Sequence, residues 1–348
     1  MRVSVQFAVE QAPWPELVDY VVEAERLGAE LCWVAEAWGG DAVTPIGFLA
    51  ARTERMRFGS GIMQLGARTP ALTAMTALTL ARITGDRYCL GLGASGPRVM
   101  EGLHGVRHGN AAGRMRETVE IVRLALAGER LEHAGRHFPL PLPDGEGAAL
   151  RLALPANPAI PIYLATLSPR MLELTGEIAD GWLGTSFVPE AASTSLEPLA
   201  AGAARAGRSL ADLDICQGAE VAFGDDVEEM VARRKPGMAF SLGGMGSAAT
   251  NFYNRAYARQ GWEEAAAEVQ RLWVAGRRDE AAARVPDDMV LATTLIGTES
   301  MVRERLRRWA DAGVTTVRLY PAGDTLGARL ATLARAIEMI REIAVSHA

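Results

Sequence analysis

Residues 91–105, GLGASGPRVMEGLHG, directly follow the apolar run Tyr88-Cys89-Leu90. The apolar run predicts a buried β-strand. Five glycines among the next fifteen residues allow the backbone to turn tightly and to approach a ligand closely. Loops that leave buried strands commonly hold cofactors in α/β proteins. We therefore expect a ligand site where this strand ends.

The glycines of this segment also match a dinucleotide-binding fingerprint, because Gly91, Gly93 and Gly96 are spaced as G-x-G-x-x-G. That fingerprint requires a helix that opens at the third glycine and an acidic residue about 20 positions later, at the end of a second strand. Pro97 and further glycines follow Gly96, which predicts a continuing loop. The acidic residues near the required distance lie in a helical pattern. The sequence therefore disfavours a Rossmann nucleotide site.

The composition favours a soluble protein that binds a small molecule. The chain has 348 residues, 49% of them hydrophobic, and a formal net charge of −6. This charge, without a lysine or arginine cluster, argues against a nucleic-acid partner. No apolar run approaches the roughly 18 residues that span a bilayer, so we expect no membrane partner. The first residues, MRVSVQF, begin a strand and show no signal-peptide pattern.

Three cysteines, Cys32, Cys89 and Cys216, each lie inside a strand-like run. Their odd number and the lack of a C-x-x-C motif indicate reduced, buried thiols, not disulfides or a zinc site. This pattern is typical of a cytoplasmic protein.

One pattern recurs along the chain: an amphipathic helix, a glycine, and a short apolar strand that ends in a small or polar residue. The first helix is expected to open at Pro15 and to stop at Gly28. Runs that are apolar on both faces predict parallel strands covered by helices. The eight runs are residues 3–9, 31–35, 57–62, 88–93, 161–165, 181–185, 215–223 and 316–320. Eight such units predict a (β/α)8 TIM barrel, with an open doubly wound sheet as the alternative.

Two segments interrupt the repeat. Residues 128–158 are rich in glycine and proline and predict a loop after the fourth helix. Residues 236–290 predict an insertion of helices between the seventh and eighth strands. Insertions of this length commonly form active-site lids or subunit contacts. The composition does not mark it as a separate domain, so we expect one barrel domain over residues 1–348.

The carboxyl ends of the predicted strands carry few polar groups and many small residues. In a barrel these ends meet at one face, which is where the active site lies. Such a face suits a flat organic cofactor that backbone groups and apolar walls hold. It does not suit a metal, because histidines and carboxylates do not recur at ligand spacing. His104 and His108 are flanked by glycines, so a helical zinc-protease motif is not expected.

Several short pieces, in order along nearly the whole chain, together resemble the luciferase-like flavin and deazaflavin oxidoreductases. The pieces are WVAEA (33–37), GI (61–62) with ARTP (67–70), LGLGASGP (90–97) with EGLHG (101–105), RETVEIVR (116–123), EIADGW (177–182) and GGMG (243–246) through NFY (251–253). They are most similar to the class that uses coenzyme F420, an 8-hydroxy-5-deazaflavin. The resemblance implies a bacterial-luciferase-like barrel and a bound deazaflavin.

The resemblance also implies roles for individual residues around the ring. A cis peptide bond between Gly61 and Ile62 would lie beneath the deazaflavin; alternatively, the glycine only lets the strand bulge. Glu36 and Ala37 would lie near the ring or its ribityl chain, although Glu36 could also be an ordinary loop carboxylate. Ala37 replaces the histidine of relatives that carry an Asp-His pair here, which removes the family's best-known proton donor.

Further cofactor contacts follow from the same resemblance. The ring edge would contact Ala94, Ser95, Gly96 and Pro97, with Arg98 in place of a common amide. The phosphate group would lie at Ala165, Thr166, Leu167 and Ser168 together with Gly184 and Thr185. Ser168-Pro169 is also an ordinary helix start, and both roles are compatible because a helix N-terminus attracts anions. Trp38 is the candidate for stacking near the open face of the ring.

The resemblance implies hydride transfer between the deazaflavin and a small organic substrate such as an imine, an activated alkene or a carbonyl compound. Glu36, Glu101 and His104 are the hypotheses for proton delivery, although Glu101 and His104 could instead pin their loop. An FMN-dependent two-component monooxygenase is the alternative function, and a non-catalytic barrel is a third. We expect a homodimer, since two-fold dimers are the commonest assembly.

Overall fold

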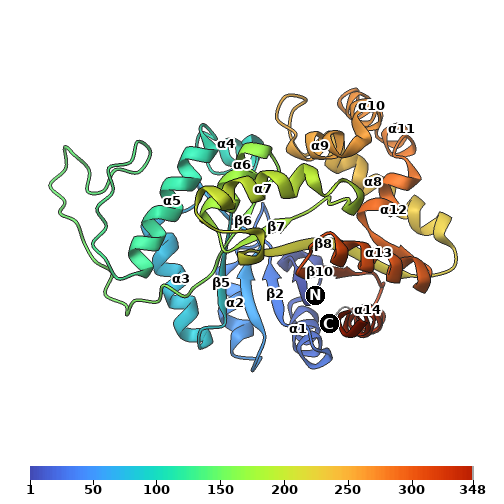
Figure 1. Ribbon diagram of the computed structural model, residues 1–348, viewed down its shortest axis with the longest axis horizontal. Helices are drawn as coiled ribbons and strands as arrows, with labels where there is room; N and C mark the ends of the chain where they lie inside the picture. The colour runs from blue at the N-terminus through green and yellow to red at the C-terminus, as the bar shows by residue number, and fades with distance from the viewer. Residues whose placement is uncertain (347–348) are drawn as a thin grey trace.

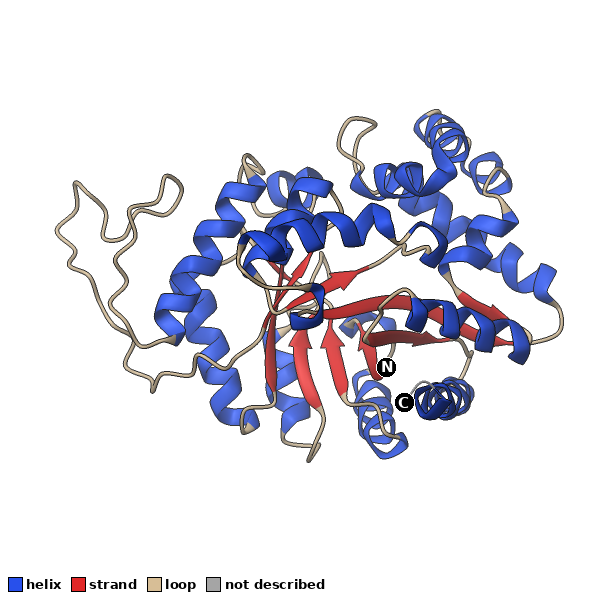
Figure 2. Ribbon diagram, in the orientation of Figure 1, coloured by secondary structure: helices blue, strands red, loops and turns tan. Residues whose placement is uncertain are grey.

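The two-faced apolar runs form parallel strands that close into a barrel, so the chain is a (β/α)8 barrel and not an open sheet (Figure 2). The computed structural model describes residues 1–346. Closure is direct, because the last strand pairs with both the first strand and the seventh barrel strand. The barrel strands are β1 (Arg2–Phe7), β2 (Leu31–Val34), β3 (Arg57–Ser60), β5 (Tyr88–Gly93), β6 (Ile162–Ala165), β7 (Gly181–Gly184), β8 (Asp214–Phe223) and β10 (Thr316–Pro321).

Helices surround this barrel, and capping residues mark where they begin and end. Pro70 occupies the first turn of its helix, and the Thr69 side chain accepts a hydrogen bond from the Leu72 N–H. Gly28 ends the first helix with a φ of 106°, which a residue with a side chain rarely adopts. The outer helices are α1 (Trp14–Leu27), α2 (Val43–Ala50), α3 (Pro70–Thr84), α5 (Ala111–Leu126), α6 (Pro169–Ile178), α7 (Ser193–Arg205), α13 (Glu299–Asp311) and α14 (Leu326–Ser346). Within residues 1–346, no helix has the length and apolar character to cross a membrane.

The insertion between the last two barrel strands starts earlier than predicted. Its first helix, α8, begins at Val227 and contains Pro236, the residue at which the sequence predicted the boundary. Its remaining elements are α9 (Phe252–Tyr257), a π-helical turn (Ala258–Trp262), α10 (Glu263–Val274), α11 (Arg278–Ala283), α12 (Asp287–Thr293) and the short strand β9 (Leu295–Gly297). Buried residues of these helices form a hydrophobic cluster of their own. Figure 1 shows this group at one end of the barrel, beside β8.

Residues 127–161 form the predicted loop between α5 and β6, and Figure 1 shows it projecting away from the barrel. Its start is fastened to α5, because the Glu117 carboxylate accepts hydrogen bonds from the backbone N–H groups of residues 136–138. Farther along, Leu142 and Leu150 are 65% and 74% exposed. The loop contributes no strand to the barrel.

One carboxylate ties the amino-terminal end of the barrel together. Asp214, at the start of β8, receives a hydrogen bond from the Tyr163 hydroxyl of β6 at 2.9 Å and pairs with Arg2 of β1 at 2.8 Å. The hydroxyls of Thr315 and Thr316 also donate to it. Strands that are far apart in sequence therefore share one buried acceptor.

A second buried carboxylate joins α1 to the turn before β3. Glu25 is 8% exposed and accepts hydrogen bonds from the backbone N–H groups of Glu54, Arg55 and Met56. Burial by itself raises the pKa of Glu25, but these three N–H groups outweigh it and hold the pKa below its usual range. The ionised carboxylate therefore stabilises the fold.

Glu25→Gln should lower the free energy of unfolding at pH 7 by about 2 kcal/mol, because charge-assisted hydrogen bonds are lost and an amide N–H faces backbone donors. The difference from the wild type should persist above the unfolded carboxyl pKa of about 4.3 and vanish as the pH falls through the lower folded value. Urea unfolding at several pH values measures both effects. Glu23→Gln, which alters an exposed pair with Arg26, is the control, and an equal loss in both variants would contradict the assignment.

Candidate active site

The residues expected to bind a cofactor gather at the carboxyl end of the barrel. Glu36 follows β2, Gly61 follows β3, Ala94 follows β5, Thr166 follows β6 and Thr185 follows β7. The carboxyl ends of parallel barrel strands meet at one face, which we call the mouth. Most of these residues are half-buried, whereas Thr166 and Gly184 are buried and Ala37 is exposed.

The Glu36 carboxylate is held by a bidentate ion pair with Arg68. Two guanidinium nitrogens lie 2.5 and 2.8 Å from its two oxygens, and the backbone N–H groups of Ala42 and Gln64 also donate to them. The hydrogen bond to Glu36 raises the pKa of Arg68, so its guanidinium stays charged. Glu36 is therefore a fixed negative charge at the mouth, with both oxygens occupied. Arg68 had no role in the sequence analysis, although it lies in the ARTP piece.

The Gly61–Ile62 peptide bond is cis, as the resemblance implied. The Ile62 side chain lies against Gly93, where a Cβ would come within 2.6 Å of Ile62 Cδ1. Ile62 and Ala165 pack on a cluster inside the barrel that includes Trp33 and Leu183. Small residues thus leave an apolar floor below the mouth, which suits one face of a flat ring.

The glycine-rich segment differs from the prediction, since a short helix, α4 (Pro97–Gly102), opens at Gly96. The sequence predicted a continuing loop because glycine and proline are poor helix formers, but proline is well tolerated in a first turn. Just before α4, Ser95 has a φ of 56°, and its carbonyl lies 3.2 Å from His108 Nε2. The dinucleotide fingerprint still fails, because the chain forms a closed barrel.

Glu101 and His104 lie on the exposed side of this segment. The Glu101 carboxylate accepts a hydrogen bond from the His108 N–H at 3.1 Å, which corresponds to the loop-pinning alternative. His104 is exposed, and its side chain forms no hydrogen bond within residues 1–346. His108, which had no predicted role, stacks on Phe252 of α9 with ring centroids 6.2 Å apart. The segment is thereby joined to the insertion.

The expected phosphate-binding residues surround the start of α6. Ser168 is the N-cap of α6, but its hydroxyl makes no capping bond. Thr166 is buried, and its hydroxyl bonds to Thr175 at 2.8 Å. Gly184 lies against the buried Gln217 amide, whose nitrogen and oxygen have no hydrogen-bond partner in residues 1–346. The Ser168 hydroxyl therefore stands at the N-terminus of α6 without a capping bond, in a position to donate to a bound anion.

Arg259 adds a positive charge to the same place. This residue of the π-helical turn donates a hydrogen bond to the Leu167 carbonyl at 2.5 Å and pairs with no carboxylate of the described chain. Burial, and next the nearby Arg255, lower its pKa, which shows that the surroundings disfavour its charge. A bound anion would relieve this. Because residue 259 is distant from α6 in sequence, no local pattern could reveal the contact.

Trp38, the stacking candidate, is 59% exposed at the mouth. Its neighbour Ala37 is also exposed, so neither residue is fixed by packing. Their predicted ring contacts stay predictions.

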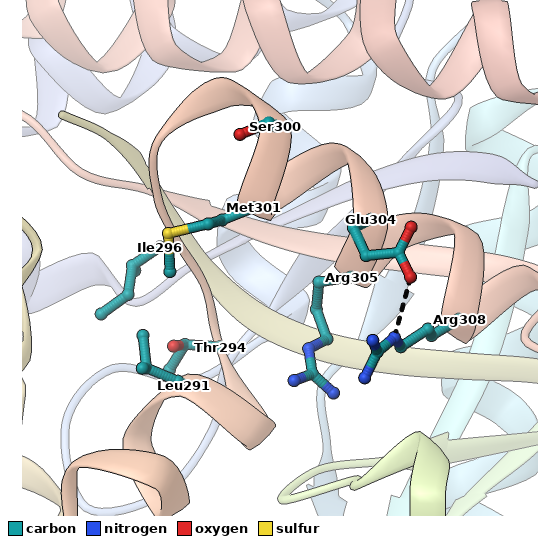
Figure 3. Close-up of a pocket in the computed structure, with 8 residues that line it drawn as sticks. All are labelled: Leu291, Thr294, Ile296, Ser300, Met301, Glu304, Arg305 and Arg308. Atoms are coloured by element: carbon teal, nitrogen blue, oxygen red, sulfur yellow. Dashed lines mark hydrogen bonds and ion pairs between the residues drawn. The ribbon is translucent and has the colours of Figure 1, made fainter. Parts of the chain in front are cut away.

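A cavity of about 330 Å³ lies away from the mouth, between α12 and α13 (Figure 3). Its charged groups are paired within the protein, since Arg305 and Arg308 bind Glu190 and Arg308 also binds Glu304. The hydroxyl of Thr294 donates to a helix carbonyl. The charged side chains of the cavity are therefore engaged in ion pairs within the protein, and we place the candidate site at the mouth.

Comparison with known proteins identifies relatives of this chain. A model of the luciferase-like monooxygenase family matches residues 1–316. A Mycobacterium tuberculosis protein provisionally named a coenzyme F420-dependent oxidoreductase is 40% identical over 90% of this chain and 93% of its own length. A 5,10-methylenetetrahydromethanopterin reductase of Archaeoglobus fulgidus is 28% identical over 94% of each chain. The structure of the coenzyme F420-dependent tetrahydromethanopterin reductase of Methanopyrus kandleri superposes with a TM-score of 0.80, covering 99% of each chain at 22% identity, and so shares the fold.

The Glu36–Arg68 pair should contribute measurable coupling. Arg68→Met and Glu36→Gln should each destabilise the protein by about 2 kcal/mol, because each leaves one poorly solvated charge or donor without its partner. A double-mutant cycle measured by urea unfolding should give a coupling energy of about 1–3 kcal/mol.

The bidentate Arg116–Glu177 pair provides the control, because it is more exposed and its coupling should stay below about 1 kcal/mol. Equal coupling in the two pairs would show that Glu36 is not specially held.

Proposed function

This chain belongs to the luciferase-like monooxygenase family and is an oxidoreductase, and we propose that it uses coenzyme F420 to transfer a hydride to or from a small organic substrate. The observation that carries the proposal is the combination, at one barrel mouth, of an apolar floor and an unpaired cationic group. The 40% identity to a relative named as coenzyme F420-dependent supports the choice of cofactor.

The residues at the mouth fit the parts of a deazaflavin coenzyme. When bound, the deazaflavin supplies the hydride-accepting and hydride-donating carbon. The apolar floor at Ile62 and Ala165 would contact one face of the ring, with the Ile62 side chain seated against Gly93. Ala94, Ser95, Gly96 and Pro97 would border the ring edge.

The phosphate group would lie at the start of α6. The Ser168 hydroxyl and the helix N-terminus offer hydrogen-bond donors, and Arg259 supplies a charge that lacks a protein counterion. Leu167, Gly184 and Thr185 complete this end of the site.

The three candidates for proton delivery differ in whether their side chains are already engaged within the protein. Both oxygens of Glu36 already accept hydrogen bonds, so this residue orients the site through its charge. Glu101 is engaged with its own loop. Of the three candidates, we therefore favour His104 for exchanging a proton with substrate, because its side chain has no competing partner in the described residues. The substrate class of imine, activated alkene or carbonyl, and the homodimer, stay predictions.

The cofactor assignment is tested by absorbance titration of the purified protein with coenzyme F420 and, separately, with FMN. The wild type should bind coenzyme F420. Arg259→Ala should weaken that binding by about 10-fold or more, because a charge-assisted hydrogen bond to phosphate is lost. Arg271→Ala, which removes a surface arginine paired with Glu268, should leave the affinity unchanged.

Tight binding of FMN without binding of coenzyme F420 would contradict the proposal and favour a flavin-dependent monooxygenase. Binding of neither cofactor would favour a non-catalytic barrel.

A further inference from the structure

Arg318 is a buried cation at the mouth without a counterion. It lies on β10 between Ser4 of β1 and Gly218 of β8, and it is 6% exposed. The neighbouring glycine makes room for it, since a Cβ on Gly218 would come within 2.7 Å of Arg318 Nη2. Its side chain therefore occupies the barrel interior.

Neutral groups receive the hydrogen bonds of this guanidinium. Nε donates to the Tyr320 hydroxyl at 2.9 Å, and Nη2 donates to the Gly184 carbonyl at 3.0 Å. Nη1 makes no hydrogen bond, and Arg318 forms no ion pair with a carboxylate of residues 1–346. A buried charge without a counterion is costly. At the opposite end of the barrel, Arg2 is by contrast paired with Asp214.

The guanidinium reaches the mouth, where the cofactor is proposed to bind. Gly184 is the last residue of β7, so its carbonyl belongs to the mouth. From Arg318 the hydrogen bonds continue, since the Tyr320 hydroxyl donates to Gln6 Oε1 at 3.3 Å. That oxygen lies beside Gly61, because a Cβ built there would be 3.5 Å from it. Hydrogen bonds thus join Arg318 to Gln6, whose side chain lies beside the cis peptide.

We propose that Arg318 anchors the substrate and that the substrate carries a carboxylate, which pairs with the free Nη1 of the guanidinium. The bonds to Tyr320 and Gly184 fix the plane of the guanidinium, so the remaining donor has one direction in which to bind. This assignment rests on the proposed function, since it takes the mouth to be the place of reaction.

The test compares benzoate with benzamide, which has the same shape without the charge, by isothermal titration calorimetry. Titrations are made with the cofactor-free protein and with protein saturated with coenzyme F420. The wild type should bind benzoate about 10-fold or more tightly than benzamide. Arg318→Met should lose this preference, Arg318→Lys should recover part of it, and the surface variant Arg271→Met should keep it.

Gly218→Ala offers a second variant that keeps the charge but displaces the guanidinium, and it should weaken benzoate binding several-fold. Coenzyme F420 affinity should change less than two-fold in Arg318→Met. A loss of cofactor affinity with benzoate binding unchanged would assign Arg318 to the cofactor and overturn the proposal.

The comparison of benzoate with benzamide on the wild-type protein tests the proposal even if a variant fails to fold. No preference for benzoate over benzamide, including binding of neither, overturns the proposal. Benzoate binding that depends on Arg318 in a protein that does not bind coenzyme F420 would support the anion site and refute the proposed cofactor.

Discussion

The carboxylate of Asp214 is the interaction that makes the two ends of this barrel differ. At the amino-terminal end it collects donors from β1, β6 and the start of β10, so strands distant in sequence are held by one buried charge. This end is stable because its charges are paired. At the opposite end, the mouth, several arginines donate to backbone carbonyls and have no counterion in residues 1–346. The amino-terminal end thus holds its charges in pairs, whereas the mouth holds the Glu36–Arg68 pair beside arginines without a counterion in the described chain.

Much of this architecture could be predicted from the residues, because buried parallel strands and amphipathic helices have different periodicities. The runs at Leu31–Val34 and Ile162–Ala165 are short, apolar and bounded by glycine or proline, and each is a strand. The strands β4 (Met63–Gln64) and β9 were missed, because two or three residues carry no periodicity. The charged helix α13 was also not predicted. The predicted boundary of the insertion at residue 236 was also wrong, since Pro236 lies inside α8, which begins at Val227.

The candidate site was less predictable, because its geometry depends on contacts between distant segments. The position of Glu36 followed from the resemblance, but its capture by Arg68 requires the fold. Three further arginines at the mouth share a property that sequence could not reveal. Arg98, Arg259 and Arg318 donate to backbone carbonyls and have no carboxylate partner within residues 1–346. The mouth therefore holds three guanidinium groups without a counterion among the described residues, in a protein whose net charge is −6.

The insertion is fastened to the mouth on one side. Hydrogen bonds join it to Arg98 after β5, to Leu167 after β6 and to Ser186 after β7. In residues 1–346, none of its hydrogen bonds reaches the loops after β1, β2 or β3. The insertion is therefore fastened to the mouth on the side of β5, β6 and β7, and the exposed Trp38 follows β2 on the other side. A cofactor held on the fastened side would exchange slowly, whereas a substrate would enter and leave beside Trp38.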